Sequence, residues 1–192
     1  MIGRMGRWEP NGRGRLEQAA LELYVEHGFE RTTVAEIAAR AGLTERTFFR
    51  HFADKREVLF GGSELLRQRM VDAATAAPAG ATPLEAVGAG LDAVGEVFRE
   101  RHAHAPRRAT VIAANPELRE RELIKLATLA AALADTLRER GVAEPAASLA
   151  AQSGITVFHV AFQQWIADDE ERDLGLLMRA GLDELRAVTR AG

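Results

Sequence analysis

The chain has 192 residues, a formal net charge of −3 at pH 7, and 47% hydrophobic and 28% charged residues, proportions typical of a globular protein. It contains no cysteine, which excludes disulfide-stapled scaffolds and cysteine-ligated zinc or iron–sulfur sites. No stretch approaches the roughly 18 uncharged apolar residues of a transmembrane helix, and no apolar run follows the N-terminal arginines as it would in a secretory signal. We therefore expect a soluble, cytoplasmic protein with no membrane association. The basic residues are 23 arginines and two lysines, and alanine is frequent, a bias that indicates a GC-rich bacterial genome.

Helical periodicity runs through nearly the whole chain, and no segment alternates as a half-buried strand does. The predicted fold class is all-α, with about nine helices. The first helix carries Leu16 and Leu23 on its apolar face and ends at Gly28, since glycine suits the left-handed position after a helix. A second helix begins after Thr33, which forms with Glu36 the pattern of a capping box.

Further caps continue this pattern toward the C-terminus. Gly42 ends the second helix, and Thr44 caps a third helix that runs to about His51. Asp54 is expected to cap a fourth, longer helix, with Glu57 at the capping-box position. Later helices are predicted over residues 84–102, 106–114 and 116–140, from residue 145 onward, and from residue 174 to the end.

The stretch APAGATP, residues 77–83, has the proline, glycine and small residues of a connection and marks a change of subdomain. We therefore predict an N-terminal three-helix domain over residues 10–60 and a C-terminal helical bundle over residues 61–192, which the fourth helix joins.

Residues 33–52, TVAEIAARAGLTERTFFRHF, hold two short helices joined by a tight Ala-Gly-Leu turn. This is the pattern of a helix-turn-helix, whose second helix enters the DNA major groove. Phe48 and Phe52, four residues apart, are expected to face inward. The outward positions are then taken by Arg46, Phe49 and Arg50.

From about Arg13 to Phe60 the sequence resembles the TetR family of transcriptional regulators. The resemblance depends on the order of its parts: a glycine-terminated first helix, then TTV, IA, AG, a T-x-F-x-H-F core and a lysine that opens the fourth helix. It implies a three-helix DNA-binding domain and a helical C-terminal domain that forms a homodimer and binds a small effector.

The resemblance also assigns DNA contacts by position. The residues that match phosphate contacts of the family are Thr33, Thr47, His51 and Lys55. Those that match its base-reading positions are Glu45, Arg46 and Arg50. The exposed first turn of the third helix, including Thr44, adds hydroxyl and amide groups that suit phosphate. The family most often has tyrosine where this chain has Phe49, so a hydroxyl contact is missing, and a thymine methyl or a sugar edge is the candidate contact instead.

Each of these assignments has a structural alternative. Arg46 and Arg50 can be a solvated helix face, and His51 can be an ordinary surface or core histidine. The N-terminal arginines are either an arm that contacts the minor groove or backbone or a disordered solubilising tail. The arginines concerned are Arg4, Arg7, Arg13 and Arg15.

The C-terminal helices carry two further sets of candidates. An effector pocket is expected where polar groups border apolar side chains, and its candidates are Phe98, His102, Arg107, Arg108, Gln152 and His159. The second set is an apolar stripe, which is either core or subunit interface. The candidates for a dimer interface are Phe158, Phe162, Trp165, Leu182 and Leu185, with Ala146, Ala147, Ala150, Ala151 and Gly154 as the small residues that would let two subunits approach. No metal site is expected, because His102 and His104 would point about 200° apart on a helix.

No catalytic motif is present: the sequence has no Gly-x-Ser-x-Gly, no phosphate-binding glycine loop and no His-Glu-x-x-His, so neither catalysis nor a cofactor is expected. The sequence predicts a homodimeric repressor that binds a palindromic operator in double-stranded DNA and is released by an unknown small-molecule effector. Two alternatives remain open: a helix-turn-helix adaptor controlled by a protein partner, and a helical-bundle enzyme.

Overall fold

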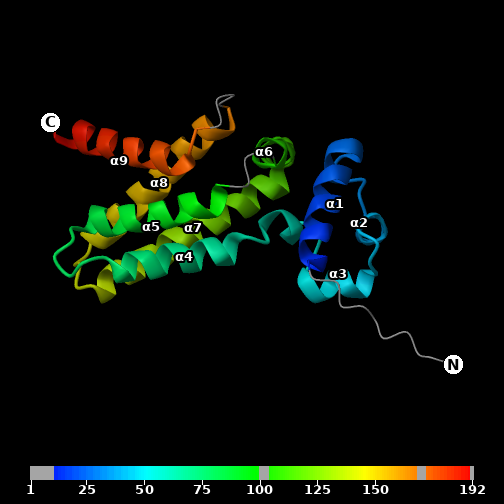
Figure 1. The fold of residues 1–192 in the computed structure, drawn as a ribbon, viewed down its shortest axis with the longest axis horizontal. Coiled ribbons are helices and arrows are strands. Elements are labelled where there is room, and N and C mark those ends of the chain that lie inside the picture. Colours follow the sequence, from blue (N-terminus) through cyan, green and yellow to red (C-terminus); the bar gives the residue numbers. More distant parts are fainter. Residues whose placement is uncertain (1–10, 100–103, 168–171, 191–192) are drawn as a thin grey trace. The chain divides into compact units, whose positions relative to one another are not determined.

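The computed structural model describes residues 11–99, 104–167 and 172–190. In this part of the chain the regular structure is entirely helical, as predicted. The chain divides after Gly61 into two compact units, here called unit 1 and unit 2 (Figure 1).

Unit 1 contains three α-helices and one 3₁₀ turn: α1 (Gly12–His27), α2 (Val34–Arg40), α3 (Glu45–His51) and η1 (Glu57–Phe60). α1 packs on α2, α3 and η1, and α2 packs on α3. Burial of apolar side chains from all four elements is the main force that holds them together. The core includes Leu16, Ala20, Leu23, Ile37, Ala38, Phe48, Phe52 and Phe60.

The helix boundaries in unit 1 follow from local capping. Thr33 and Glu36 form the predicted capping box at the start of α2, and Thr44 accepts the backbone N–H of Thr47 at the start of α3. Gly28, after α1, and Gly42, in the turn between α2 and α3, have φ of +84° and +65°, which non-glycine residues rarely adopt. The prediction of a helix-turn-helix at these residues is confirmed.

Unit 2 is a bundle of six helices: α4 (Ser63–Ala76), α5 (Pro83–Phe98), α6 (Ala105–Ala114), α7 (Pro116–Glu139), α8 (Ala146–Ile166) and α9 (Leu174–Arg190). α5 lies at the centre of the packing, against α4, α8 and α9, while α7 packs on α4, α6 and α8 (Figure 1). No described helix is long and apolar enough to cross a membrane.

Small residues let the helices of unit 2 approach closely. A Cβ added at Gly154 of α8 would lie 2.4 Å from a methyl carbon of Val87 on α5, and one added at Gly95 of α5 would lie 2.9 Å from the Cα of Gly175 on α9. Ala147 and Ala151 are fully buried on the same face of α8. Ala147, Ala150, Ala151 and Gly154 therefore pack inside the subunit and not at a dimer interface as was expected, whereas Ala146 is exposed.

Two predicted elements differ from the structure. Asp54 does accept the backbone N–H groups of Arg56 and Glu57, but the turn that it caps ends at Phe60, and α4 begins only at Ser63. The adjacent Gly61 and Gly62 disfavour a continuous helix, because glycine loses the most conformational freedom in one. The helix expected over residues 84–102 is described to Phe98, and residues 100–103, including His102, lie outside the described part.

Candidate nucleic-acid interface

The exposed face of α3 carries charged side chains that have no hydrogen bond or ion pair within the described residues. Glu45, Arg46 and Arg50 are all exposed, as the sequence predicts. In the described part of the chain, neither arginine has a hydrogen bond or an ion pair. Their guanidinium groups are therefore available to bond an external acceptor such as a guanine edge or a phosphate.

The other arginines between residues 11 and 61 are all engaged within unit 1. Their acceptors are carboxylates or backbone carbonyls, which are the usual partners of structural arginines. The pairs are Arg13 with Glu17 and the Gly61 carbonyl, Arg15 with the Ala41 carbonyl, Arg31 with the His27 carbonyl, Arg40 with Glu22 and Glu26, and Arg56 with Asp54. This contrast separates Arg46 and Arg50 from the arginines that hold the fold.

Aromatic residues fix the orientation of α3. Phe48 is fully buried, and its ring packs against Phe52 with centroids 5.6 Å apart. Phe49 is exposed, and its ring packs edge-to-face against that of Phe48, with the ring centroids 5.4 Å apart. The inward and outward positions therefore agree with the expected helix-turn-helix, and α3 presents its polar face to solvent.

Hydroxyl groups at the start of α3 leave a donor for phosphate. The Oγ1 atoms of Thr44 and Thr47 lie 3.1 Å apart, so the pair shares one hydroxyl hydrogen and keeps the other free to donate. His51 is half-buried, beside the start of α1: a Cβ added at Gly12 would lie 3.7 Å from its Nε2 atom. Both threonines and His51 thus remain candidates for the phosphate contacts.

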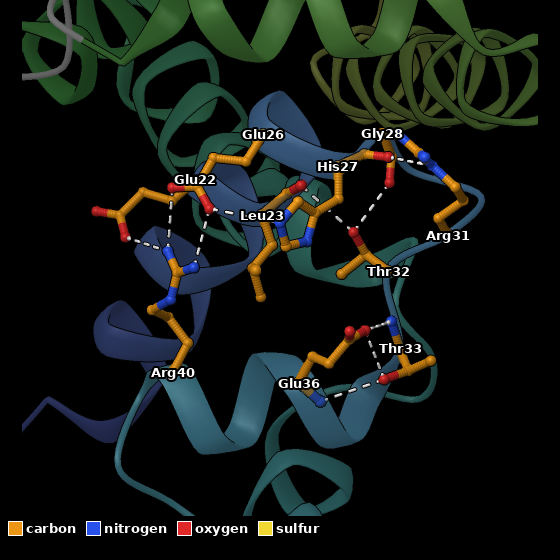
Figure 2. A network of polar contacts seen from close by, with 10 residues as sticks. All are labelled: Glu22, Leu23, Glu26, His27, Gly28, Arg31, Thr32, Thr33, Glu36 and Arg40. Atoms are coloured by element: carbon orange, nitrogen blue, oxygen red, sulfur yellow. Dashed lines mark hydrogen bonds and ion pairs between the residues drawn. The ribbon is translucent and has the colours of Figure 1, made fainter.

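Thr33 has a different role in this conformation. Its backbone N–H and its hydroxyl both donate to Oε2 of Glu36, each at 2.8 Å, and its Oγ1 accepts the N–H of Glu36 (Figure 2). These hydrogen bonds lower the pKa of the Glu36 carboxyl. The hydroxyl hydrogen that Thr33 was expected to give to a phosphate is therefore given to Glu36.

A cluster of charges fixes α2 against α1. Arg40 of α2 donates to both carboxylate oxygens of Glu26 at 3.2 and 2.9 Å and lies 3.5 Å from Glu22, both on α1 (Figure 2). Hydrogen bonding by Arg40 lowers the pKa of Glu26. Sequence reasoning missed this pair, because the residues are 14 positions apart and no periodic pattern links them.

Lys55 is held inside unit 1. Its Nζ atom donates to the backbone carbonyls of Phe29, Glu30 and Thr32 at 2.8, 3.2 and 3.0 Å and lies 4.4 Å from the centre of the Phe29 ring. An ammonium group has three hydrogens to donate, so all of them are used. In this conformation Lys55 anchors the α1–α2 turn, and its ammonium group has no hydrogen left for the phosphate contact that was expected.

A tyrosine fixes the backbone on the other side of Lys55. Tyr24 donates its hydroxyl to the carbonyl of Lys55 at 2.6 Å, and burial, with a contribution from the Asp54 charge, raises the pKa of that hydroxyl. The connection after α3 is thereby tied to α1. The sequence analysis did not single out Tyr24, although it is the chain's only tyrosine.

The N-terminal arginines divide into two groups. Arg13 and Arg15 lie in α1 and bond carbonyls of unit 1, which fits neither of the two alternatives, a flexible arm or a disordered tail. Arg4 and Arg7 lie outside the described residues.

The predicted dimer stripe lies mostly in the core of unit 2. Phe158, Trp165 and Leu182 are buried within the subunit, and Phe162 and Leu185 are partly buried against the same core. A buried side chain cannot also be the contact surface for a second subunit, so the core alternative holds for Phe158, Trp165 and Leu182, while Phe162 and Leu185 keep part of their surface exposed. The exposed face of α8 instead carries Leu149, Gln152, Thr156, His159, Val160 and Gln163.

The described residues among those expected to line an effector pocket do not come together, and His102 lies outside the described part. Gln152 and His159 are exposed on that outer face of α8, and Arg107 is exposed on α6. Arg108 is half-buried and lies 3.2 Å from Glu122 of α7; burial lowers the pKa of its guanidinium, and Glu122 opposes that shift. Only Phe98, at the end of α5, joins the aromatic cluster of unit 2, defined as Phe98, Phe158, Phe162 and Trp165. Within the described residues no cluster of acidic, histidine or cysteine side chains is arranged to hold a metal ion.

Two family models match the chain. The model described as bacterial regulatory proteins, tetR family, matches residues 17–60, and the model of the MftR C-terminal domain matches residues 81–190, which is more than half of the chain.

Similar proteins include two transcriptional regulators. TcmR of Streptomyces glaucescens is 40% identical over 82 residues, which are 43% of this chain and 36% of TcmR. The uncharacterized HTH-type regulator Rv2250c of Mycobacterium tuberculosis is 31% identical over 86 residues, 45% of this chain and 44% of that protein. The chain thus matches less than half of the length of each relative.

Solved structures share the fold. FadR from Bacillus subtilis, in complex with stearoyl-CoA, superposes with a TM-score of 0.62 at 22% identity over 88% of this chain and 95% of that one. The complex of SmeT with triclosan gives 0.64 at 21% identity over 92% and 90%; SmeT is the repressor of a Stenotrophomonas maltophilia efflux pump. Because the two family models follow each other along the chain, over unit 1 and over most of unit 2, the protein belongs to the TetR family, whose members are DNA-binding transcriptional regulators and not enzymes.

Proposed function

We propose that the protein is a homodimeric repressor that binds a palindromic operator through α3 and leaves it when a small molecule binds unit 2. The observation that carries the DNA-binding part is the pair Arg46 and Arg50, which are exposed on α3 and have no partner in the described structure. Glu45 lies beside them at the first position of the helix. A glutamate can accept from cytosine N4 and an arginine can bond guanine O6 and N7.

Alanine variants test this assignment. Arg46→Ala and Arg50→Ala should each cost about 1–3 kcal/mol of operator binding and relax the preference at one or two base pairs per half-site. Arg119→Ala, which removes an exposed arginine of α7, is the control and should leave operator binding unchanged. Equal losses on operator and random DNA would reduce both α3 arginines to phosphate contacts.

The exposed outer face of unit 2 supports a dimer. Leu149 and Val160 of α8 and Leu176 of α9 are 64%, 49% and 59% exposed, although the inner faces of the same helices are fully packed. Exposed leucine and valine side chains in one region are typical of a subunit interface. Two subunits would also place two copies of α3 on DNA, about 34 Å apart, as a two-fold symmetric operator requires.

An effector with an apolar body and an acidic group fits unit 2 best. The ring of Phe98 lies 5.6–6.1 Å from the other three rings of the aromatic cluster, and Phe98 and Phe162 are partly exposed. Arg107 and Arg108 of α6 supply positive charge within the same unit. FadR and SmeT were solved with stearoyl-CoA and triclosan, and both ligands have a large apolar part.

A thermal-shift screen of metabolites and antibiotics, followed by measurement of each hit's affinity with and without operator, tests the effector. Release of DNA by a factor of 100 requires about 2.7 kcal/mol of coupling, and DNA must weaken effector binding by the same factor. Hits that bind equally well with and without operator would contradict regulation by a small molecule and favour a protein partner.

A further inference from the structure

Phe49 is the exception among the phenylalanine and tyrosine side chains described between residues 11 and 61. It is 55% exposed, whereas Tyr24, Phe29, Phe48, Phe52 and Phe60 are all at most 4% exposed. Aromatic side chains are enriched at interfaces, and phenylalanine is among the side chains that make apolar contacts with DNA bases, so the exposed ring of Phe49 is suited to contact with a partner.

The position of Phe49 indicates which partner. Phe49 follows Arg46 by three residues and directly precedes Arg50, so it lies among the two arginines that have no contact within the described structure. All three belong to α3, the second helix of the helix-turn-helix, which is the helix that enters the major groove in this motif. The partner is therefore a group on the floor or wall of that groove.

The ring is also held in place before any DNA arrives. Its centroid lies 5.4 Å from that of Phe48 with the planes 82° apart, the edge-to-face arrangement that aromatic pairs favour. Phe48 itself is fully buried. The exposed ring thus has a fixed support.

A phenyl ring can neither donate nor accept a conventional hydrogen bond, so it cannot bind a phosphate oxygen as a hydroxyl does. The apolar group that base pairs present in the major groove is the C5-methyl group of thymine. We propose that Phe49 reads a thymine in each half-site of the operator through this methyl group. The proposal rests on the proposed DNA binding by α3 and specifies one base of the sequence that is read.

The test changes only the methyl group. An operator is first selected from random duplex DNA, and each thymine in it is then replaced by deoxyuridine, which lacks the methyl and keeps every hydrogen-bonding group. We expect one thymine position of the half-site to respond. Replacement at that position in a single half-site should lower the affinity of the wild-type protein about fourfold, the equivalent of about 0.8 kcal/mol for one buried apolar carbon. Replacement in both half-sites should cost roughly 15-fold if the two sites are independent.

Variants of Phe49 complete the experiment. Phe49→Ala should bind the thymine and deoxyuridine operators equally, while Arg50→Ala, the matched control on the same helix, should bind both more weakly and keep the fourfold difference. Since the Phe49 side chain is exposed, we expect Phe49→Ala to fold. If it does not fold, a wild-type protein that binds every deoxyuridine operator as tightly as the thymine operator still contradicts the proposal.

Three results would overturn it. The first is a wild-type protein that binds all deoxyuridine operators as tightly as the thymine operator. The second is a Phe49→Ala variant that keeps the fourfold difference. The third is a Phe49→Ala variant that loses the same factor on operator and random DNA, as a contact to sugar would. Failure to select any operator would instead overturn the proposed function together with this inference, so the two failures are distinguishable.

Discussion

At the scale of single residues, the structure separates positive charges that hold unit 1 together from those that are free for DNA. Lys55 illustrates the difference, because its ammonium group donates to three carbonyls of the α1–α2 turn. The sequence places Lys55 directly after α3, where a phosphate contact is a reasonable expectation. The sequence does not reveal that three backbone carbonyls of the α1–α2 turn, more than 20 residues earlier in the chain, point toward the ammonium group of Lys55.

Replacement of Lys55 by methionine, which keeps most of the apolar stem, should therefore destabilise unit 1 by about 1–2 kcal/mol, since three carbonyls lose a charged donor. Thermal or denaturant unfolding measures that loss. Affinity for DNA, measured at a temperature where the variant is folded, should keep the wild-type dependence on salt. If Lys55 contacted a phosphate, the slope of log K against log [salt] would fall by about 1 per subunit, and that result would contradict the anchoring role.

At the scale of helices, what the sequence revealed was mostly local. The capping box of Thr33 and Glu36, the cap at Thr44 and the stops at Gly28 and Gly42 were all predictable, because the groups that cap a helix end lie within three residues of it. The break between η1 and α4 was not predicted, since the Asp54 pattern continues into an apolar run and only the adjacent Gly61 and Gly62 mark the interruption.

The capping boxes make the stability of the protein depend on pH in the acid range. Thr33 holds the pKa of Glu36 below its ordinary value of 4.5, and Thr82 does the same for Glu85 at the start of α5. A carboxyl whose pKa is lowered by folding contributes stability that is complete above the ordinary pKa and disappears as pH falls through the lowered one. Each carboxylate should therefore stabilise the protein at neutral pH and no longer do so in strong acid.

Glu36→Gln and Glu85→Gln test this in the two units separately. Glutamine also occurs at this position of a capping box, so each variant should fold. Each should be less stable than the wild-type protein at pH 7, and the difference, measured by urea unfolding, should shrink as pH falls below 4.5. A difference that stays constant from pH 7 to pH 3 would show that the lowered pKa has no part in stability.

At the scale of the whole molecule, the proposed dimer raises the question of which surface a second subunit would cover. The period of 3.6 residues shows that α8 has an apolar face, but it does not tell whether a subunit's own core or another subunit covers that face. The structure buries Phe158 and Trp165 in the subunit's own core. The opposite face, with the exposed Leu149 and Val160, is left as the surface for a partner.

Leu149→Glu should convert the dimer into a monomer and weaken operator binding by at least a factor of 100, because two linked reading helices bind far more tightly than one. Leu123→Glu provides a matched control, since Leu123 on α7 is 66% exposed and Leu149 is 64% exposed. Light scattering at micromolar concentration measures both. Dissociation by Leu123→Glu with Leu149→Glu unaffected would move the interface to α7.

Selection of bound sequences from random duplex DNA tests the central claim most directly. With the wild-type protein we expect enrichment of one two-fold symmetric sequence whose half-sites are centred about one helical turn of DNA, or a multiple of it, apart. With the double variant Arg46→Ala, Arg50→Ala we expect that enrichment to disappear, while weak salt-dependent binding to any DNA remains. Absence of any enriched sequence with the wild-type protein, or the same enriched sequence with the double variant, would contradict the reading of DNA by the exposed face of α3.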